Sequence, residues 1–312
     1  MPPRTLVIVN PASRSGRTRK IFDALEARLR DALGPLEVDW TQGPRDAERL
    51  AREGARAGVE RILVAGGDGT ASEVVAGVLA ADLADEIQIG FLPLGTGKDL
   101  VRGLGLAMNV EEAITDIAAG RTRQIDAGRL HYLNHGGEPR VTSFINSATV
   151  GISGLIVQLV NESGKGMGGS LAFLLGTLRA LARFQPAPAT LELDGTKIYE
   201  GDLVLATACN GPFFGGGMRG APGACFDDGL LDVVVIPGLT KARLLRRLPN
   251  LYAGTHIEVP GVLRFQGREL LVSAAPGSQL LEIDGEPLGC APVRFEVLPE
   301  AVTLVGVKET NR

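Results

Sequence analysis

Two glycine-rich turns near the start of the chain constrain its fold more than any other feature. The first is residues 66–70, spelled Gly-Gly-Asp-Gly-Thr, and the second is residues 93–99, spelled Pro-Leu-Gly-Thr-Gly-Lys-Asp. Each turn follows an apolar run that predicts a strand and precedes a segment with helical character. Glycine lets a backbone approach a ligand closely, and the free N–H groups at a helix start attract anions. Together the turns predict a nucleotide phosphate site.

Polar residues at these strand ends admit two interpretations. Asp68 would repel a phosphate unless a cation lies between them, which favours Mg²⁺ with a nucleotide polyphosphate over a bare anion. Thr96 can hydrogen-bond a phosphate or cap the following helix. Asn10, which ends the strand expected at residues 5–9, can contact a nucleotide or form a turn. For any one of these turns alone, a tight strand-to-helix connection with a capping aspartate is the alternative.

Composition fits an enzyme of two domains. The chain has 312 residues, 45% of them hydrophobic, and is long enough to bury two cores. Its net charge of −4 shows no sign of a nucleic-acid partner, which would need a basic surface. The three cysteines, Cys209, Cys225 and Cys290, lack metal-type spacing and are odd in number, which favours free buried thiols in a reducing cytosol.

No segment predicts a membrane span, and the N-terminus lacks the charged-then-apolar order of a signal peptide. We therefore expect a cytoplasmic protein. A lipid substrate would have to be met from outside the bilayer, by peripheral contact with the inner face of the membrane. The oligomeric state cannot be predicted from the sequence.

The pattern of expected elements changes near residue 128. Before it, four strands alternate with four helices, which predicts a parallel sheet with helices on both faces. These strands are expected at residues 5–9, 36–40, 61–65 and 87–92, and the helices at 18–32, 45–57, 70–81 and 98–119. After it, short strands separated by turn residues predict an antiparallel sandwich or barrel. These are expected at residues 140–147, 190–198, 203–209, 231–236, 269–273, 280–284 and 293–298.

Two helices interrupt the second half. Residues 170–184 place leucines at helical spacing, with Arg179 and Arg183 at the edge of that stripe, and predict either a core helix or a lipid-binding surface. Residues 240–251 cluster three arginines beside Lys241. That segment predicts either a solvated basic face or a surface that touches anionic lipid headgroups.

The order and spelling of the motifs resemble the catalytic domain shared by diacylglycerol kinases, sphingosine kinases and soluble bacterial lipid kinases. The resemblance rests on Asn10-Pro11 with the loop at 13–16, on the two glycine turns, and on Asp284-Gly285-Glu286, and it covers nearly the whole chain. NAD kinases and phosphofructokinases carry a turn similar to the first one. The resemblance implies an α/β nucleotide-binding domain with a parallel sheet at 1–128, joined by a returning segment at 299–312. It also implies a β-rich sandwich or barrel-like lipid domain at 129–298, with the active site in the cleft between the domains.

The resemblance also implies site residues. Nucleotide-binding residues are implied at Asn10, Gly66, Gly67, Asp68, Gly69, Thr70, Gly95, Thr96, Gly97 and Lys98. Asp99 is implied as a catalytic carboxylate beside the nucleotide, and Asp68 and Asp126 as carboxylates around its Mg²⁺. Without the family, Asp126 is equally an ordinary residue at a strand end. The family mostly has Asn where this chain has Lys98, and lysine brings a positive charge but, unlike asparagine, cannot accept a hydrogen bond.

Glu286 is implied as the general base that accepts the proton of the lipid hydroxyl. In phosphoryl transfer the protein mainly positions groups and neutralises charge, so one well-placed carboxylate suffices as the base. The spacing alone would favour a hairpin, because Asp-Gly is a common two-residue turn.

A second metal is implied by the acidic stretch at 226–232. In bacterial relatives a similar stretch holds a structural Mg²⁺, which assigns the side chain of Asp228 and the carbonyl oxygens of Cys225 and Leu230 as ligands. Such hard oxygen ligands suit Mg²⁺ or Ca²⁺. Without the family, the stretch is an acidic turn before a strand.

The sequence therefore predicts an ATP- and Mg²⁺-dependent lipid kinase acting on diacylglycerol or a similar lipid. An NAD kinase-like enzyme is the alternative within enzymes, disfavoured by the second turn and the Asp228 loop. A non-catalytic lipid-binding relative is the alternative outside enzymes, disfavoured by the presence of Asp68, Asp99 and Glu286.

Overall fold

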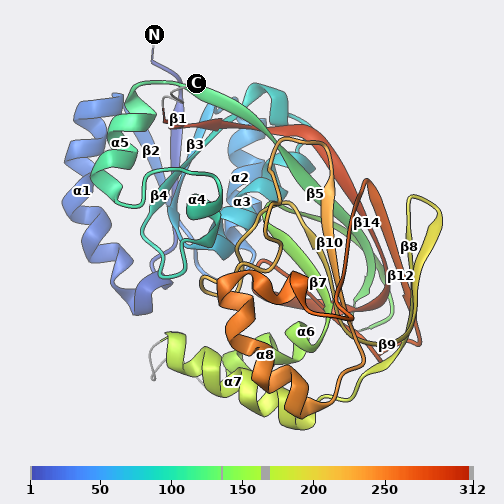
Figure 1. Cartoon of the computed structure of the whole chain (residues 1–312). Helices are drawn as coiled ribbons and strands as arrows, with labels where there is room; N and C mark the ends of the chain where they lie inside the picture. Colours follow the sequence, from blue (N-terminus) through green and yellow to red (C-terminus); the bar gives the residue numbers. More distant parts are fainter. Residues whose placement is uncertain (1, 135, 163–168, 309–312) are drawn as a thin grey trace. The chain divides into compact units, whose positions relative to one another are not determined.

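The computed structural model describes residues 2–134, 136–162 and 169–308. The chain divides into two units: unit 1 is Met1–Ala127 with Pro299–Arg312, and unit 2 is Gly128–Leu298. Figure 1 shows an α/β region near the N-terminus and a region of long curved strands in the rest of the chain. This is the predicted combination of an α/β fold and a β-rich fold.

Unit 1 is built on a parallel sheet of five strands in the order β2-β1-β3-β4-β14. The strands are β1 (Thr5–Val9), β2 (Leu36–Trp40), β3 (Arg61–Gly66), β4 (Gln88–Pro93) and the last residues of β14 (Glu286–Val305). All six residues of β3 are buried, as expected for a parallel strand covered on both faces. The end of β14 joins through Thr303 beside Gln88 and Leu304 beside Ile89.

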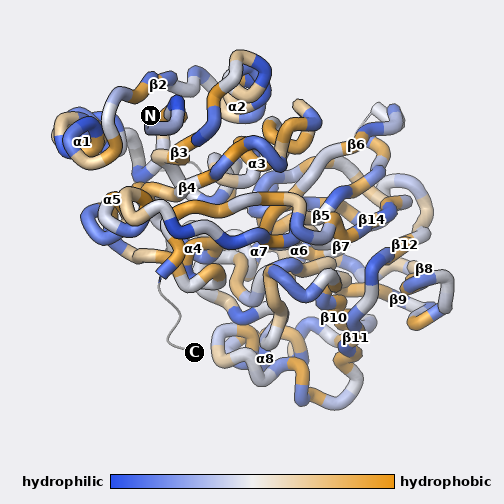
Figure 2. The backbone as a smooth tube through the Cα atoms, turned by 90° about the horizontal axis from the view of Figure 1, so that it is seen from above, coloured by the Kyte–Doolittle hydropathy of each residue, from blue (hydrophilic) through white to orange (hydrophobic). Residues whose placement is uncertain are grey.

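Helices cover both faces of this sheet. They are α1 (Thr18–Leu33), α2 (Asp46–Arg56), α3 (Asp68–Ala80), α4 (Asp99–Gly103) and α5 (Val110–Ala118), with 3-10 turns at Ser13–Gly16 and Ala84–Glu86. Phe22 of α1 and Ile114 of α5 pack in one core with Val7 and Leu63 of the sheet. Helix α2 lies against the opposite face, where Gly54 abuts Leu6. Hydrophilic and hydrophobic residues alternate along α2 in Figure 2, as its single buried face requires.

The single helix expected at residues 98–119 is wrong. The segment forms two helices, because α4 ends at Gly103 and Gly105 adopts a positive φ of 69° that a helix does not allow. Asn109 then caps α5, its side-chain oxygen accepting a hydrogen bond from the backbone N–H of Glu112 at 2.9 Å. The other three helices and all four strands predicted for this half are confirmed within one or two residues.

Unit 2 is antiparallel. Its strands, besides part of β14, are β5 (Thr122–Asn134), β6 (Pro139–Phe144), β7 (Ser147–Gly151), β8 (Ala187–Leu193), β9 (Thr196–Cys209), β10 (Leu231–Pro237), β11 (Leu263–Gly267), β12 (Glu269–Ala274) and β13 (Leu280–Ile283). The pairings β9-β7-β13-β14-β12-β8-β9 return to their starting strand, so the sheet closes on itself. The barrel-like architecture predicted for this half is confirmed, and Phe144 and Phe295 meet edge to face in its core at 6.5 Å.

Three helices pack on this sheet: α6 (Ile152–Glu162), α7 (Gly169–Arg183) and α8 (Lys241–Ala253), the last followed by a 3-10 turn at Thr255–Glu258. Phe184, just after α7, shares a core with Ile152 of α6 and Ile236 of β10. The helices predicted at 170–184 and 240–251 are confirmed, whereas α6 was not predicted. Within the described residues, no helix is both long enough and apolar enough to cross a membrane.

Two predicted strands are each divided in two. Asp194 and Gly195 take positive φ values of 49° and 75°, so residues 190–198 turn back on themselves as the hairpin between β8 and β9. Residues 140–147 break between β6 and β7, where the carboxylate of Asp284 accepts hydrogen bonds from the N–H groups of Ile145 and Ser147. Neither break follows from local hydrophobicity.

The three cysteines are free, but only Cys209 is buried and Cys225 is exposed, so the expectation of three buried thiols is wrong.

We predict that Gly77→Ala destabilises unit 1 although alanine is the better helix former. A Cβ at Gly77 would lie 2.2 Å from the carbonyl oxygen of Glu48 and 3.0 Å from Cβ of Ala51, so α2 and α3 would have to separate. Overpacking of this kind costs about 1–3 kcal/mol in the free energy of unfolding, measured by urea denaturation. Gly43→Ala is the control, because nothing lies within 4 Å of its Cβ position. An unchanged stability of Gly77→Ala would contradict this packing.

Candidate functional site

The predicted phosphate turns lie together in unit 1. Asn10 follows β1, the first glycine turn follows β3 and the second follows β4, and these three strands are adjacent and parallel. Because the carboxyl ends of parallel strands meet at one edge of a sheet, the turns form a single surface. Residues nearly ninety positions apart in the chain therefore contribute to one candidate site.

The Asp68 carboxylate holds the two glycine turns together. Its Oδ2 accepts the N–H of Asp99 at 3.0 Å, and its Oδ1 accepts the N–H of Leu100 at 3.4 Å. Burial raises the pKa of Asp68, the N–H of Asp99 opposes that rise, and the nearby Asp99 carboxylate adds to it. A divalent cation beside this carboxylate would offset both the loss of hydration and the repulsion between the two acids.

Glycine is required where the turns touch. A Cβ on Gly95 would lie 2.3 Å from Cα of Gly67, and a Cβ on Gly97 would lie 2.8 Å from Oδ2 of Asp68. Backbone cannot yield at such distances, so any larger residue at Gly95 would push the turns apart. The glycines of the second turn thus serve the contact with the first turn, in addition to any approach of a ligand.

Asn10 connects the first strand end to the same site. Its side-chain amide donates to the hydroxyl of Thr70 at 2.9 Å, and its side-chain oxygen accepts the N–H of Ala12 at 3.0 Å. Asn10 is therefore a turn former and also a link to the first turn of α3. That helix begins at Asp68 with Gly67 as its N-cap, so its first N–H groups lie at the predicted anion site.

The second turn leads into the short helix α4, which begins one residue after the start predicted at residue 98. Helix α4 begins at Asp99 with Lys98 in the N-cap position, so Thr96, which is exposed, does not cap it. Asp99 is 3% exposed and its Oδ1 pairs with Nη1 of Arg102 at 3.2 Å. The lysine ammonium donates to the carbonyl oxygen of Met108 at 2.6 Å, and Lys98 has a positive φ of 58°. That backbone conformation suits asparagine better than lysine.

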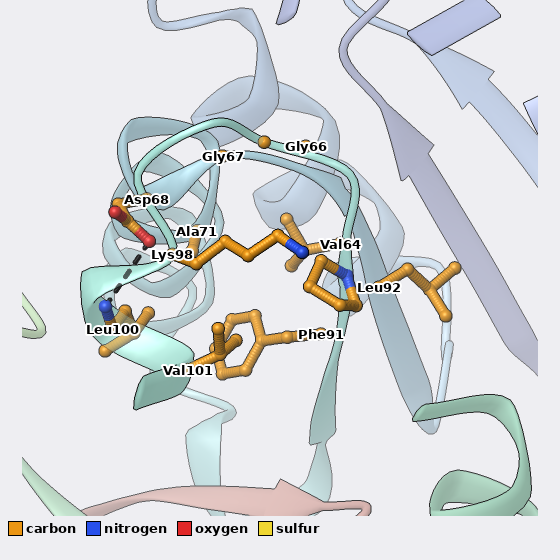
Figure 3. Close-up of a pocket in the computed structure, with 12 residues that line it drawn as sticks. Val64, Gly66, Gly67, Asp68, Ala71, Phe91, Leu92, Lys98, Leu100 and Val101 are labelled. Atoms are coloured by element: carbon orange, nitrogen blue, oxygen red, sulfur yellow. Dashed lines mark hydrogen bonds between the residues drawn. The ribbon is translucent and has the colours of Figure 1, made fainter. Parts of the chain in front are cut away.

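A small cavity lies against the two turns. Its lining combines glycine backbone and Asp68 with the apolar side chains of Phe91 and Val101. Figure 3 shows the Asp68 carboxylate joined to the N–H of Leu100, and the Lys98 side chain running away from that carboxylate. The cavity of about 20 Å³ has room for about one water molecule, so it is a packing gap beneath the turns and not a nucleotide pocket.

Asp126 has a structural contact. It lies in β5, is 1% exposed, and its Oδ1 accepts the N–H of Glu300 at 2.8 Å. Glu300 has a positive φ of 52°, so the aspartate fixes a strained residue where β14 returns to unit 1. Its predicted role as a Mg²⁺ ligand stays a prediction.

In unit 2, Asp284 and Gly285 form the two-residue turn between β13 and β14. Both have positive φ, 46° and 89°, and Ile283 pairs with Glu286 across the turn. Asp284 points back into the sheet, where its Oδ1 accepts the N–H of Ser147 at 2.8 Å. Glu286, the predicted base, is exposed at the first position of β14. The Asp-Gly-Glu motif therefore forms a hairpin turn, and this turn places Glu286 at the start of β14.

Glu282 is a buried acid that the sequence analysis did not identify. It is 4% exposed, its Oε2 accepts the N–H of Gly285 at 2.9 Å, and its Oε1 accepts the hydroxyl of Thr149 at 2.8 Å. Burial raises its pKa to about 7, opposed by these two hydrogen bonds and reinforced by Asp284 and Glu286. Its apolar neighbours in β13 give no local sign of such a role, and only its position two residues before the Asp-Gly pair could have suggested it.

The acidic loop contains one carboxylate with suitable surroundings for a cation. Asp228 is exposed, and its Oδ1 accepts the N–H of Leu230 at 3.0 Å, which turns the chain before β10. Cys225 is also exposed, so its carbonyl belongs to a surface loop. In the described part of the chain, no three His, Cys, Asp or Glu side chains gather to hold a metal. The predicted sites rely on single carboxylates with a nucleotide or with backbone carbonyls, and they stay predictions.

A second feature missed by the sequence analysis is an apolar cavity beneath α8. Its volume is about 40 Å³ and aliphatic side chains line most of it. These are Ile236, Leu239, Leu244, Leu251, Val259 and Val262. Arg247 and His256 add two polar groups, and burial lowers the pKa of His256. The lining comes from β10, α8 and the segment after it, so no single stretch of sequence carries the pattern.

Family comparisons match both halves of the chain. Residues 4–130 match the diacylglycerol kinase catalytic domain, and residues 146–306 match the YegS C-terminal NAD kinase beta sandwich-like domain. A diacylglycerol kinase of Mycobacterium tuberculosis is 30% identical over 304 residues, which covers 97% of this chain and 94% of that protein. A probable lipid kinase YegS-like of Enterobacter sp. is 29% identical over 302 residues, covering 96% and 95%.

Solved structures agree on the fold. A putative diacylglycerol kinase from Bacillus anthracis superposes with a TM-score of 0.76 at 23% identity and covers 97% of each chain. An NAD kinase from Archaeoglobus fulgidus superposes with a TM-score of 0.52 at 14% identity, covering 96% of this chain and 92% of that one. At these identities the likeness concerns fold alone, and it is greater for the first structure.

We predict that Glu282 makes stability fall as pH rises toward neutrality. Between its ordinary pKa of 4.5 and its folded value of about 7, the unfolded chain ionises while the folded chain keeps its proton. The loss begins near pH 4.5 and is complete above about pH 7. A shift of this size corresponds to a loss on the order of 3 kcal/mol.

Glu282→Gln, which cannot ionise, should therefore gain stability over the parent protein as pH increases, measured by urea denaturation from about pH 4.5 to about pH 8. Glu138→Gln is the control, because Glu138 is 60% exposed in its side chain. Parallel pH profiles for the parent protein and Glu282→Gln would show that Glu282 ionises normally in the folded state.

Proposed function

Because the chain belongs to the diacylglycerol kinase catalytic-domain family and is a lipid kinase, we propose that it transfers the γ-phosphate of ATP to a hydroxyl group of diacylglycerol or a similar lipid. One observation carries the nucleotide part of this proposal. The Asp68 carboxylate joins the two glycine turns at the carboxyl ends of β3 and β4, directly at the start of α3. Such a turn, with free N–H groups and close glycine backbone, suits a nucleotide polyphosphate.

The nucleotide is assigned to the turns of unit 1. Residues Gly66–Thr70 and Gly95–Lys98 would bind phosphates through backbone N–H groups, and Asn10 would orient the first turn through Thr70. Asp68 and Asp99 fit Mg²⁺ in donor chemistry, since both are poorly hydrated carboxylates near each other. When bound, Mg·ATP supplies the phosphoryl group and a charge that offsets these acids. Asp126 is a third candidate ligand, although one of its oxygens is engaged by Glu300.

Glu286 is assigned as the general base. Three acids lie within five residues, but they have different surroundings. Glu282 and Asp284 accept backbone N–H groups of Gly285 and Ser147, respectively, and so fix the turn. Glu286 is exposed at the start of β14 and is the acid of the three that can receive a proton from an incoming hydroxyl.

The lipid is assigned to unit 2. The cavity beneath α8 offers aliphatic walls that suit an acyl chain, with Arg247 and His256 at polar positions in its lining. Its volume of about 40 Å³ is far below that of a ligand site, so α8 would have to move to admit a chain. Diacylglycerol is the first candidate because a relative that this chain matches over 94% of the relative's length bears the name diacylglycerol kinase.

The acidic loop is assigned a structural cation. One carboxylate, Asp228, with carbonyl oxygens of Cys225 and Leu230 forms a hard-oxygen donor set that suits Mg²⁺ or Ca²⁺. The bond from Leu230 N–H to Asp228 already shapes the loop, so the ion would reinforce a turn that exists without it.

We predict that the protein, given radiolabelled ATP and Mg²⁺, labels a lipid and not NAD. The panel contains diacylglycerol, a sphingoid base, phosphatidylglycerol and a polyprenol in mixed micelles, with NAD as the competing acceptor. Label in diacylglycerol above the other lipids is the expected result. Label in NAD alone would replace the lipid assignment with an NAD kinase, and label in another lipid would correct the substrate.

We predict that Glu286→Gln lowers kcat by roughly 10²- to 10⁴-fold, the usual contribution of a general base, with little change in KM for ATP. Glutamine keeps the size of the side chain but cannot accept the proton. Asp68→Asn should instead weaken Mg·ATP binding, because it removes charge beside the nucleotide while keeping one acceptor for the N–H of Asp99.

Steady-state kinetics with varied ATP separate the two effects, and Glu138→Gln serves as the control for loss of an exposed acid in unit 2. Near-normal turnover of Glu286→Gln, or a loss confined to ATP binding, would remove Glu286 as the base. Asp99 and Asp126 would then be the next carboxylates to substitute.

A further inference from the structure

Helix α8 has two faces with different surroundings. Leu244, Arg247 and Leu251 point inward and line the apolar cavity. The positions between them in the helical repeat, including Leu245, Arg246 and Tyr252, are exposed. The helix therefore contacts the candidate acyl-chain cavity on one side and solvent on the other.

The outer face of α8 carries large apolar side chains whose exposure to water is unfavourable. Leu245 is 49% exposed and Tyr252 is 48% exposed, and they lie seven residues apart, which places them two turns apart on one side of the helix. Leu178 of the neighbouring α7 is 38% exposed. The described residues contain five exposed large hydrophobic side chains, and three of them are on these two helices.

Cations flank this apolar strip. The α8 segment contains Lys241, Arg243, Arg246 and Arg247 and no acidic residue, although the whole chain has a net charge of −4. In the helical repeat of about 100° per residue, Lys241 borders Leu245 and Tyr252 on one side, and Arg246 lies about 100° from Leu245 on the other. Arg243 lies beyond Arg246, at the far margin of the exposed side. The Lys241 ammonium also donates to the carbonyl oxygen of Ala182, which places the exposed Arg183 of α7 near the start of α8.

An anionic lipid bilayer accounts for both features. Apolar side chains with basic residues beside them suit a helix that lies in the interface of a membrane, where the apolar residues enter the acyl boundary and the cations meet headgroup phosphates. A polyanion such as nucleic acid would match the charge but would leave Leu245 and Tyr252 in water. A lipid substrate would reach the cavity from the bilayer, and the same helix lines that cavity.

We propose that the outer face of α8, with the adjoining end of α7, docks the enzyme on an anionic membrane surface. Figure 2 shows hydrophilic and hydrophobic residues interspersed along α8. The choice of a bilayer as the partner rests on the proposed lipid kinase function. The docking itself is a binding event that needs neither ATP nor turnover.

The test is co-sedimentation of the full-length chain with vesicles of phosphatidylcholine alone or of phosphatidylcholine mixed with phosphatidylglycerol, without ATP. We expect binding to the anionic vesicles that weakens with salt. The double variant Arg243→Glu/Arg246→Glu should bind at least about thirtyfold more weakly, because each cation near such a surface contributes about 1 kcal/mol. Lys20→Glu/Arg56→Glu makes the same change in net charge on exposed helices of unit 1 and should bind as the parent protein does.

Leu245→Ser tests the apolar part and should weaken binding, whereas Val141→Ser, at a side chain that is 59% exposed in β6, should not. All variants should keep the turnover of the parent protein on a short-chain diacylglycerol dissolved as monomers. Equal binding by Arg243→Glu/Arg246→Glu and the parent would overturn the proposal. So would binding to heparin without binding to vesicles, or a dimer that Leu245→Ser dissociates.

Failure of the proposed function would be distinguishable from failure of the docking proposal. If the parent protein bound anionic vesicles but phosphorylated none of the lipids, the docking proposal would stand and the kinase proposal would be wrong.

Discussion

The hydrogen bonds from Asp68 to the N–H groups of Asp99 and Leu100 are the interaction on which the candidate nucleotide site depends. They tie the turn after β3 to the turn after β4, and the contact of Gly95 with Gly67 permits the approach. The same carboxylate is poorly hydrated, which raises its pKa and favours a cation beside it. The Asp68 side chain therefore fixes the geometry of the two turns and also makes the site favourable for a cation.

In unit 2, the acids Glu282, Asp284 and Glu286 differ in burial and in hydrogen bonding. Glu282 and Asp284 use their oxygens on backbone N–H groups and stabilise a turn whose two central residues have positive φ. That arrangement leaves Glu286 exposed at the first position of β14, directly after the turn. Burial raises the pKa of Glu282 to about 7, so the side chain that fixes this turn is also the one whose ionisation is expected to oppose folding as pH rises.

Helix α8 carries the two features on which the proposed lipid site and the proposed membrane contact depend. Its inner face lines an apolar cavity, and its outer face carries exposed Leu245 and Tyr252 between basic residues. A helix with both faces partly apolar is only marginally suited to water. Contact with a lipid surface would remove that conflict, and movement of the same helix would open the cavity.

The sequence by itself determined the parallel α/β fold of unit 1, the barrel-like fold of unit 2 and the motifs of the site, because hydrophobic periodicity and glycine turns are local. It did not determine the division of residues 140–147 or the contacts of Glu282. These depend on partners far along the chain: Asp284 bonds to Ile145 and Ser147, and Glu282 bonds to Thr149. Only the tertiary structure brought such groups together, since hydrogen bonding of a buried acid is decided by neighbours in space and leaves no local pattern.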